Sequence, residues 1–340
     1  MTLHLNLPGG GYDIYIERGA LSRAGELFSL NRRVLVVTDE GVPAEYAACV
    51  ARQCGEAHVV TVAQGEGSKS FATLETLCRV LMEKGFTRSD CVVAVGGGVV
   101  GDLSGFAAAS YMRGIDFYNI PTTVLSQVDS SIGGKVAINL DSVKNIVGAF
   151  YQPRAVIVDP DVLKTLPRRQ IANGLAEAVK MSLTSDPALF EIFERGAGES
   201  EIDTVIERSL RIKKAVVEED EKETGLRRVL NFGHTLGHGI EGAEELHGLY
   251  HGECVALGML PMCSDSVRAR LIPVLAGLGL PTEICGDLDK MLAIAAHDKK
   301  CDGKSISVVY VDEVGHFEIS KMPLDEWQKR IRSTLGEGSA

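Results

Sequence analysis

Residues 91–102 read CVVAVGGGVVGD, and this stretch decides the fold. Its first five residues are all apolar, which is typical of a short strand buried on both faces. Gly96, Gly98 and Gly101 then match the spacing G-x-G-x-x-G at the predicted start of a helix. Such a loop lets the backbone approach a pyrophosphate, whose charge a helix N-terminus attracts. We therefore expect a nucleotide here; the alternative is a tight strand-to-helix turn without a ligand.

The acidic partner of this loop stands in an unusual place. The usual dinucleotide fingerprint has an acidic residue about 20 residues further along, where it binds the ribose. In this chain the best candidate is Asp39, which lies upstream, after a predicted strand at 34–38. A second loop, QGEGSK at 64–69, also joins a strand to a helix, and its Glu66 and Lys69 could hold hydroxyls or phosphates. The alternative for the second loop is a solvated turn in which Ser68 caps the helix.

Outward from the glycine loop, the first half of the chain alternates strand and helix patterns. β-branched and apolar runs predict strands at 12–17, 34–38, 59–63, 91–95, 117–120 and 155–158. Helical spacing of apolar residues predicts helices over 43–54 and 71–84. This alternation is typical of βαβ units and of a mostly parallel sheet that is covered on both faces.

The second half has a different character. After Asp159, apolar residues recur at helical spacing over 168–183, 188–195, 202–219, 229–245 and 254–271. One hairpin is predicted at 305–311 and 316–320. We therefore expect an α/β, Rossmann-like nucleotide domain over residues 1–159 and a mostly α-helical domain over residues 160–340.

Composition excludes several classes of protein. Asp and Glu outnumber Lys and Arg by 46 to 35, a formal net charge of −11, and there is no basic run. An acidic chain lacks the basic footprint that nucleic acids and anionic membranes require, so we expect neither as a partner. We also expect no signal peptide and no membrane span. The eight cysteines form no C-x-x-C pair, which is typical of reduced thiols and favours the cytoplasm.

Histidines cluster in the second half, where four of the eight fall between residues 234 and 251. His234 and His238 are at i, i+4 and share one helix face. Thr235 stands where zinc peptidases have glutamate, which excludes that chemistry. Glu177 lies on an otherwise apolar helix, and its burial is costly unless it is paired or binds a metal. The set favours Zn²⁺, with Co²⁺ or Fe²⁺ as other candidates; the alternative is hydrogen-bonded core histidines.

A polar run at 110–153 separates the two halves. Asp129, Lys135, Lys144 and Asn145 are embedded there among small and apolar residues. Loops longer than about 12–15 residues within a compact domain are usually functional. We therefore expect ligand contacts in this run; the alternative is a plain connector.

Three more polar residues flank the histidine helix. Arg227 and Asn231 are at i, i+4 and Asn231 and His234 at i, i+3, so these side chains can share one face. Lys213 lies on the preceding predicted helix. The alternative for Lys213 and Arg227 is solvated helix surface.

Eight motifs together resemble one enzyme family. They are GGGVVGD, YMRGIDF, IPTT, QVDSSIGGK, KNIVGAFYQP, AEAVK, LNFGHTLGH and HGECVALGM. In this order they resemble the 3-dehydroquinate synthases of the sugar-phosphate cyclase superfamily, from Asp39 to about Lys300. The resemblance implies a homodimer that converts 3-deoxy-D-arabino-heptulosonate 7-phosphate to 3-dehydroquinate and phosphate in the shikimate pathway. The implied route is transient oxidation by NAD⁺, phosphate elimination, reduction and intramolecular aldol closure.

The resemblance also implies a role for each matching residue. The implied contacts to NAD⁺ are Asp39, Glu66, Lys69, Gly97, Gly98, Asp102, Thr122, Thr123, Lys144 and Thr165. The implied ligands of Zn²⁺ (or Co²⁺) are Glu177, His234 and His251, which makes His238 a proton-relay residue instead. The implied catalytic groups are Asp129, Lys135, Lys180, Lys213 and His238. The implied substrate contacts are Arg113, Asn145, Arg227, Asn231 and Lys299, with Lys299 favoured over Lys300. Arg113 resembles the arginine that reaches the phosphate in the neighbouring subunit.

Two other activities share parts of this pattern. Metal-dependent polyol dehydrogenases resemble the fold and have a glycine loop and a metal, but they do not need cations for a phosphorylated acid. Other sugar-phosphate cyclases act on sedoheptulose 7-phosphate or glucose 6-phosphate, and they tend to depart at Lys213, Arg227 and Asn231. All three residues are kept here. We therefore expect a small anionic sugar phosphate as substrate, although the chain is acidic overall.

Overall fold

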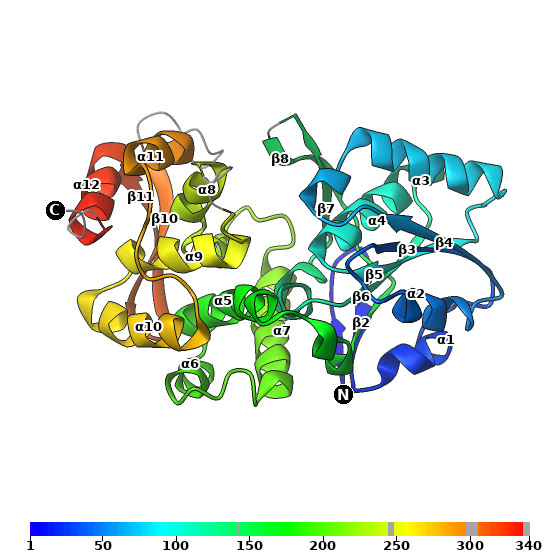
Figure 1. The fold of residues 1–340 in the computed structure, drawn as a ribbon, viewed down its shortest axis with the longest axis horizontal. Coiled ribbons are helices and arrows are strands. Elements are labelled where there is room, and N and C mark those ends of the chain that lie inside the picture. Colours follow the sequence, from blue (N-terminus) through cyan, green and yellow to red (C-terminus); the bar gives the residue numbers. More distant parts are fainter. Residues whose placement is uncertain (142, 244–247, 297–304, 336–340) are drawn as a thin grey trace. The chain divides into compact units, whose positions relative to one another are not determined.

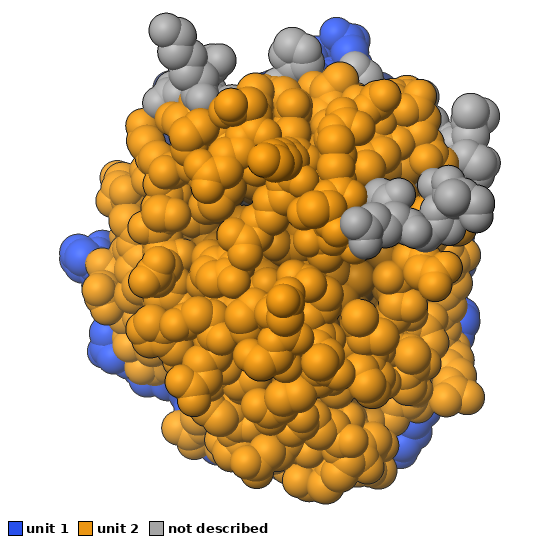
Figure 2. Space-filling model, turned by 90° about the vertical axis from the view of Figure 1, so that its left-hand side faces the viewer, with its two compact units in different colours: residues 1–167 blue, residues 168–340 orange. Residues whose placement is uncertain are grey.

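The computed structural model describes residues 1–141, 143–243, 248–296 and 305–335. The chain divides into two compact units, residues 1–167 and 168–340, which Figures 1 and 2 show. The division falls later than the expected boundary at Asp159. The Asp159 carboxylate accepts hydrogen bonds from the backbone N–H of Gly19 (2.9 Å) and Leu21 (3.0 Å), and Val162 is buried in the core beyond it. These contacts keep the segment after Asp159 in the first unit.

The first unit is built on a seven-stranded sheet with strand order β1-β2-β9-β6-β5-β3-β4. β1 and β2 are antiparallel, and every other neighbouring pair is parallel. The strands are β1 (Thr2–Leu5), β2 (Tyr12–Ile16), β3 (Arg33–Asp39), β4 (Glu56–Val62), β5 (Cys91–Gly96), β6 (Asp116–Pro121) and β9 (Ala155–Val158).

Helices cover both faces of the central strands (Figure 1), and alternate residues of these strands pack in two different cores. Val34 and Val36 of β3 pack in the core that includes residues of η1 (Ala20–Arg23), α1 (Ala24–Leu27) and α2 (Ala44–Ala51). Leu35 and Val37 pack in the other core, with α3 (Phe71–Glu83) and α4 (Gly98–Ser110). Because successive side chains of a strand point to opposite faces, an all-apolar strand needs a cover on both sides.

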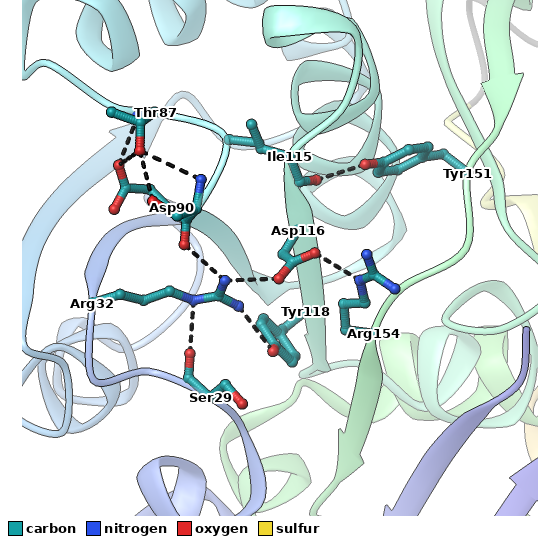
Figure 3. A network of polar contacts seen from close by, with 10 residues as sticks. Ser29, Arg32, Thr87, Asp90, Ile115, Asp116, Tyr118, Tyr151 and Arg154 are labelled. Atoms are coloured by element: carbon teal, nitrogen blue, oxygen red, sulfur yellow. Dashed lines mark hydrogen bonds and ion pairs between the residues drawn. The ribbon is translucent and has the colours of Figure 1, made fainter.

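The amino ends of the parallel strands are joined by a network of polar contacts, drawn in Figure 3. Asp116, the first residue of β6, accepts from Arg32 Nη1 (2.7 Å) and from Arg154 Nε (2.6 Å). Arg32 also donates to the backbone oxygen of Ser89 (2.9 Å) and to Tyr118 Oη (3.0 Å). Burial raises the pKa of Asp116, but the two guanidinium groups outweigh burial and lower it. Structural ion pairs therefore occupy this edge, and the opposite, carboxyl edge carries the expected nucleotide residues.

The polar run at 110–153 is more regular than a connector. It contains the short 3₁₀ turn η3 (Tyr111–Arg113), β6, a π-helical turn η4 (Ser126–Ser130) and an antiparallel hairpin of β7 (Lys135–Leu140) and β8 (Val143–Phe150). Val136 and Ile138 are buried, Ile138 in the core that α4 covers, and they hold the hairpin on the unit. The hairpin is hard to predict because β8 exposes most of its residues and alternates only weakly.

The second unit is mostly helical. Its helices are α5 (Arg168–Ser185), α6 (Pro187–Glu194), α7 (Ile202–Glu219), η6 (Leu226–Asn231), α8 (His234–Ala243), α9 (His251–Met259), η7 (Leu260–Met262), α10 (Asp265–Leu278), α11 (Leu288–Ala296) and α12 (Leu324–Leu335). One antiparallel hairpin, β10 (Ser305–Glu313) and β11 (His316–Pro323), completes it. The fold class expected from the sequence is confirmed. None of the helices in the described part of the chain has the length and apolar character needed to cross a bilayer.

Two of the expected helices are broken. The expected helix at 229–245 is a 3₁₀ turn followed by α8, because Gly233 has a φ of 76° that a continuous helix does not allow. The expected helix at 254–271 ends at Met259, passes through η7 at Pro261, and starts again at α10, where Ser264 caps Val267 N–H at 3.3 Å. Both breaks lie next to α9, which carries one of the expected metal ligands.

Candidate functional site

Glu177, His234 and His251 form a compact group in the second unit. The distance from Glu177 Oε1 is 3.6 Å to His234 Nε2 and 3.4 Å to His251 Nε2. The three side chains offer ligand atoms that all lie within 4.8 Å of one another. Tetrahedral zinc with bonds of about 2.0–2.2 Å places its ligand atoms roughly 3.3–3.6 Å apart. Both distances from Glu177 Oε1 therefore fit a divalent ion bound between the three residues.

Glycines allow the two histidine helices to approach closely. A Cβ atom on Gly258 of α9 would lie 1.9 Å from the backbone oxygen of Gly233, and one on Gly237 of α8 would lie 3.2 Å from the backbone oxygen of Cys254. Larger side chains at these positions would separate α8 from α9. Since His234 begins α8 and His251 begins α9, this packing sets the distance between the two imidazoles.

The start of α9 is also fixed against α5, which carries Glu177. A Cβ on Gly252 would lie 2.0 Å from the backbone oxygen of Asn173, and Gly252 N–H donates to Asn173 Oδ1 at 2.6 Å. Arg169 of α5 binds both carboxylate oxygens of Glu253 at 2.7 Å. These contacts place His251 beside Glu177.

Hydrogen bonds on the far side of each ring aim both Nε2 atoms at Glu177. His251 Nδ1 lies 3.3 Å from Glu241 Oε2, and His234 Nδ1 lies 3.1 Å from the backbone oxygen of Phe232. Metal-binding histidines characteristically bind a carboxylate or a carbonyl through the second ring nitrogen, which fixes the tautomer and the ring orientation. Sequence reasoning missed Glu241; its spacing of three residues from His238 on α8 was the available signal.

The group is strongly charged, and its carboxylate is shielded from solvent although 31% of the His251 side chain is exposed. Glu177 and Lys180 each have 1% of the side chain exposed, and the Lys180 ammonium contacts the Glu177 carboxylate. Burial raises the pKa of Glu177, but Lys180 and His251 outweigh burial and lower it well below its usual range. Burial lowers the pKa of His251, but the carboxylates of Glu177 and Glu241 outweigh burial and raise the pKa above its usual range. A carboxylate that remains ionised when buried is the form that binds a metal cation.

His238 lies outside the Glu177 group. Its ring centre is 5.5 Å from that of His234 and 6.1 Å from that of His251, and it forms a second compact group with Glu241 and His251. Because α8 places His234 and His238 on one face, both reach the same region, but only His234 approaches Glu177. A shared helix face therefore does not place His234 and His238 in one group: His234 joins Glu177 and His251, and His238 joins Glu241 and His251.

Lys213 and Arg227 are buried, at 6% and 2% exposure, so the alternative of solvated helix surface is wrong for both. They lie on α7 and η6, which pack against each other and against α5. Arg227 Nη1 donates to the backbone oxygen of Glu221, and Asn231 Nδ2 donates to Glu223 Oε1 at 2.5 Å. Three cationic side chains, including Lys180, are thus buried in the layer that carries Glu177.

Asp220 builds the loop that leads to Arg227. Its carboxylate accepts from the backbone N–H groups of Thr224 (2.9 Å), Gly225 (2.7 Å) and Arg227 (3.0 Å). Burial raises the pKa of Asp220, but these donors outweigh burial and lower it to about 2. Sequence reasoning missed this residue; the signal was an aspartate at a helix C-terminus followed by a glycine five residues later.

In the first unit, the expected nucleotide residues gather at the carboxyl edge of the sheet. Asp39 ends β3, the loop with Glu66 and Lys69 follows β4, Gly97 and Gly98 follow β5, and Thr122 and Thr123 follow β6. These four strands are consecutive in the sheet. The carboxyl edge of such a sheet is where open α/β folds bind ligands.

The glycine loop has little space for larger side chains. A Cβ on Gly97 would lie 3.1 Å from the Thr123 methyl group, and one on Gly98 would lie 3.2 Å from Ser130 Oγ. Asp39 is 8% exposed, and burial raises its pKa although the N–H groups of Gly41 and Val42 partly offset the effect. These features suit a phosphate at the N-terminus of α4 and a hydroxyl at Asp39.

Lys69 links several of these residues. It is 4% exposed, and its Nζ donates to Asp102 Oδ2 at 2.7 Å and contacts Asn145 Oδ1. Glu66 Oε1 lies 3.6 Å from the same Nζ. The alternative of a plain solvated turn at 64–69 is therefore wrong, because a buried ammonium and two carboxylates meet there.

The remaining expected residues are dispersed. Asp129 lies in η4, whereas Lys135 and Lys144 lie exposed on the β7–β8 hairpin. A small hollow is lined by Asp102, Ser130 and Lys135, among others. Thr165 lies 3.4 Å from Tyr46 Oη, on the side of the sheet that α2 covers. Lys299 is outside the described residues.

Arg113 is separated from the glycine loop along α4. It follows the C-terminus of that helix, whose 13 residues span about 20 Å. Met112 and Arg113 both have positive φ, 52° and 67°, which is strained for residues other than glycine. The structure therefore does not bring Arg113 to the nucleotide residues of its own chain.

Two family models match the chain. The 3-dehydroquinate synthase N-terminal model matches residues 59–173, and the 3-dehydroquinate synthase C-terminal model matches residues 174–301. A 3-dehydroquinate synthase of Streptococcus suis is 40% identical over 349 residues, which cover 96% of this chain and 98% of the relative. One of Streptococcus sanguinis is also 40% identical, over 98% of this chain and 100% of the relative.

Solved structures show the same architecture. A 2-deoxy-scyllo-inosose synthase complexed with carbaglucose-6-phosphate, NAD⁺ and Co²⁺ has a TM-score of 0.89 and 27% identity, over 98% of this chain and 100% of that one. The 2-epi-5-epi-valiolone synthase ValA of Streptomyces hygroscopicus, with NAD⁺ and Zn²⁺ bound, has a TM-score of 0.86 and 26% identity, over 96% and 97%. A probable glycerol dehydrogenase of Sinorhizobium meliloti, with a TM-score of 0.63 and 19% identity over 96% and 97%, is similar in fold alone.

Proposed function

The chain belongs to the 3-dehydroquinate synthase family, and from that premise we propose that it converts 3-deoxy-D-arabino-heptulosonate 7-phosphate to 3-dehydroquinate and inorganic phosphate. This is a phosphate-eliminating carbon–oxygen lyase reaction of aromatic amino-acid biosynthesis. The observation that carries the proposal is the 40% identity to 3-dehydroquinate synthases over nearly the whole chain, together with three buried cations, Lys180, Lys213 and Arg227, on elements that pack together with the helix of Glu177. Ammonium and guanidinium groups bind carboxylates and phosphates, and this substrate has both.

Two cofactors accompany this activity, NAD⁺ and a divalent metal, Zn²⁺ or Co²⁺. When bound, NAD⁺ supplies a reversible hydride acceptor and the metal supplies a Lewis acid. Glu177, His234 and His251 would hold the metal, because their ligand atoms have the separations of a tetrahedral site. Asp39, Glu66, Lys69, Gly97, Gly98, Asp102, Thr122, Thr123, Lys144 and Thr165 would hold NAD⁺.

The other residues of the chain bind and orient the substrate and move protons. Lys180, Lys213 and Arg227 hold the negative groups of the substrate and stabilise negative charge that develops on it. Asn231, Asn145 and Lys299 position its hydroxyls and acid groups, and Asp129 and Lys135 contribute further polar contacts. His238 exchanges a proton at its imidazole nitrogen, since it lies beside the residues that would bind the metal but is not one of them.

We propose a homodimer that works in the cytoplasm. Arg113 supports the dimer, because it lies about one α4 length from the nucleotide residues of its own chain and is exposed. In a dimer it would instead reach the phosphate of the substrate bound by the neighbouring subunit. Light scattering on the purified protein would give the mass of two chains.

A substrate panel tests the proposed function and separates it from the two rival activities. The purified chain is incubated with NAD⁺, Zn²⁺ and one of four substrates: the heptulosonate 7-phosphate, sedoheptulose 7-phosphate, glucose 6-phosphate or glycerol. We expect phosphate release and 3-dehydroquinate, identified by NMR, from the heptulosonate alone. Cyclisation of a sugar phosphate that lacks a carboxylate would identify another cyclase. Net NADH from glycerol, without phosphate release, would identify a polyol dehydrogenase.

A further inference from the structure

The turn of the β7–β8 hairpin is irregular at Asn139. The pairing register of the two strands shifts between Ile138 and Leu140, because the single residue Asn139 of β7 lies opposite three residues of β8, 144–146. Asp141 and Asn145, both near the turn, have φ values of 52° and 53°. Left-handed backbone at residues other than glycine persists only where the surroundings hold it in place. Asn145, proposed above to contact the substrate, is one of these residues.

Asn139 makes three hydrogen bonds that join two separate segments. Its backbone N–H donates to the backbone oxygen of Lys69 at 2.8 Å, and its Nδ2 donates to Glu66 Oε1 at 2.9 Å. Its Oδ1 accepts from the backbone N–H of Asn145 at 2.9 Å. One side chain therefore ties the nucleotide loop at 64–69 to the strained residue of the hairpin.

These contacts close into a ring of four residues. Glu66 Oε1 lies 3.6 Å from Lys69 Nζ, and Lys69 Nζ contacts Asn145 Oδ1. Asn145 N–H binds Asn139, and Asn139 Nδ2 returns to Glu66. Lys69 also anchors the ring to α4 through Asp102.

The chemistry of the ring fixes both amide orientations. An ammonium only donates, so the atom of Asn145 that faces Lys69 is the oxygen. A carboxylate only accepts, so the atom of Asn139 that faces Glu66 is the nitrogen. Within the described part of the chain, no residue accepts from Asn145 Nδ2. The ring thus leaves that exposed amino group in place to donate to a bound ligand.

We infer that Asn139 is a positioning residue that holds Asn145 in register with the loop that carries Glu66 and Lys69. The inference rests on the proposed function, because Asn145 is proposed to contact substrate while Glu66 and Lys69 are proposed to contact NAD⁺. Asn139 touches neither ligand. It keeps the Asn145 amide, which donates to the substrate, at a fixed distance from Glu66 and Lys69, which hold NAD⁺. Hydride transfer between substrate and NAD⁺ requires such an alignment.

The variant Asn139→Asp tests this role with little change of shape. The new carboxylate still accepts from Asn145 N–H. Its other oxygen faces the carboxylate of Glu66, so the hydrogen bond to Glu66 is lost and the two carboxylates repel each other. We expect kcat/KM for the heptulosonate to fall about tenfold or more and the Kd of NAD⁺, measured by calorimetry, to rise about tenfold. The control is Val143→Thr, which changes an exposed residue of the same hairpin without changing its shape and should stay within about twofold of the parent.

A second substitution restores the donor and acceptor in exchanged order. In the double variant Glu66→Gln, Asn139→Asp, the amide of residue 66 can donate to the carboxylate of residue 139. We expect both kcat/KM and the NAD⁺ Kd of this variant to return to within about threefold of those of Glu66→Gln alone. Losses in the double variant equal to the product of the two single losses would overturn the inference. So would an Asn139→Asp variant that matches the Val143→Thr control.

The calorimetric readout separates this inference from the proposed function. The affinity for NAD⁺ can be measured without turnover. If the parent protein releases no phosphate but the double variant Glu66→Gln, Asn139→Asp recovers the Kd of NAD⁺, the inference is supported and the proposed function is overturned. Normal phosphate release and an unchanged NAD⁺ Kd in Asn139→Asp would overturn the inference alone.

Discussion

At the scale of single residues, His234 and His238 differ although they stand one turn apart on α8. His234 Nε2 lies 3.6 Å from Glu177, whereas His238 groups with Glu241 instead. We expect His234→Ala to lose both metal and activity, and His238→Ala to keep its metal while its rate falls about 10²-fold or more. Metal content by mass spectrometry, alongside phosphate release, checks both. Loss of metal from His238→Ala would contradict these roles.

Lys180 offers a second test at this scale, on stability. It is fully buried against Glu177, so Lys180→Met removes the ammonium partner of a buried carboxylate and leaves only imidazoles beside it. We expect this to cost about 3–5 kcal/mol in the free energy of unfolding of the metal-free protein. The matched control is Lys214→Met on α7, where Lys214 and Glu218 form a partly exposed pair at 2.7 Å. That pair should contribute only about 0–1 kcal/mol. Equal losses in the two variants, measured by urea unfolding, would be inconsistent with the buried pair.

At the scale of elements, the N-terminus of α4 must stay open for the nucleotide. In Gly97→Ala the new Cβ would lie 3.1 Å from the Thr123 methyl group, while the φ of −75° suits alanine. We expect the Kd of NAD⁺ to rise about tenfold with little change in thermal stability. Gly9→Ala, where a new Cβ meets nothing within 4 Å, is the control and should bind as the parent does. Unchanged binding in Gly97→Ala would place the pyrophosphate elsewhere.

The loop from α7 to η6 depends on one ionised carboxylate. The pKa of Asp220 is about 2, below the 3.8 of the unfolded chain, so its stabilising contribution is present above about pH 4 and is lost as the pH falls through 2. Because the group is partly exposed, we expect it to contribute on the order of 1 kcal/mol. Asp220→Asn should speed amide exchange at Thr224, Gly225 and Arg227 at pH 6. The difference from the parent should shrink toward pH 2, and a difference that grew on acidification would contradict the assignment.

The elements that the sequence predicts well are those whose pattern comes from burial alone. The strand at 91–96 is apolar throughout, and its two-sided cover follows directly from the alternation of its side chains. The β7–β8 hairpin was missed because much of β8 is exposed and the register shift opposite Asn139 interrupts its alternation. The helix breaks near Gly233 and Pro261 depend on the close packing of α8 and α9, and helical spacing does not encode such packing.

The candidate site divides in the same way. A buried glutamate and clustered histidines pointed to a metal from residue types alone, but the set that meets at Glu177 depends on how three helices pack. His251 was chosen over His238 as a metal ligand because of its position within the family motifs, and not because of its spacing in the sequence. Glu241, Asp220 and Asn139 were missed because they act through hydrogen bonds to other residues, and such partners become visible only in three dimensions.

At the scale of the whole molecule, Arg113 allows a test of assembly. Arg113→Ala and His234→Ala should each be inactive. If Arg113 serves the neighbouring subunit, a mixed dimer of the two variants has one complete site: the Arg113→Ala chain supplies His234, and its partner supplies Arg113. We expect mixing, with unfolding and refolding to exchange subunits, to restore a measurable share of parental phosphate release. An inactive mixture would show that Arg113 acts within its own chain or that no dimer forms.

The central claim is that this chain eliminates phosphate from the heptulosonate by a metal-dependent reaction in which NAD⁺ is regenerated in each turnover. The most direct measurement follows phosphate release and NADH absorbance together, with catalytic NAD⁺, before and after a chelator is added. We predict phosphate in many-fold excess over NAD⁺, no net NADH, loss of release with chelator and recovery with Zn²⁺ or Co²⁺. Stoichiometric NADH, or phosphate release that the chelator leaves unchanged, would contradict the account.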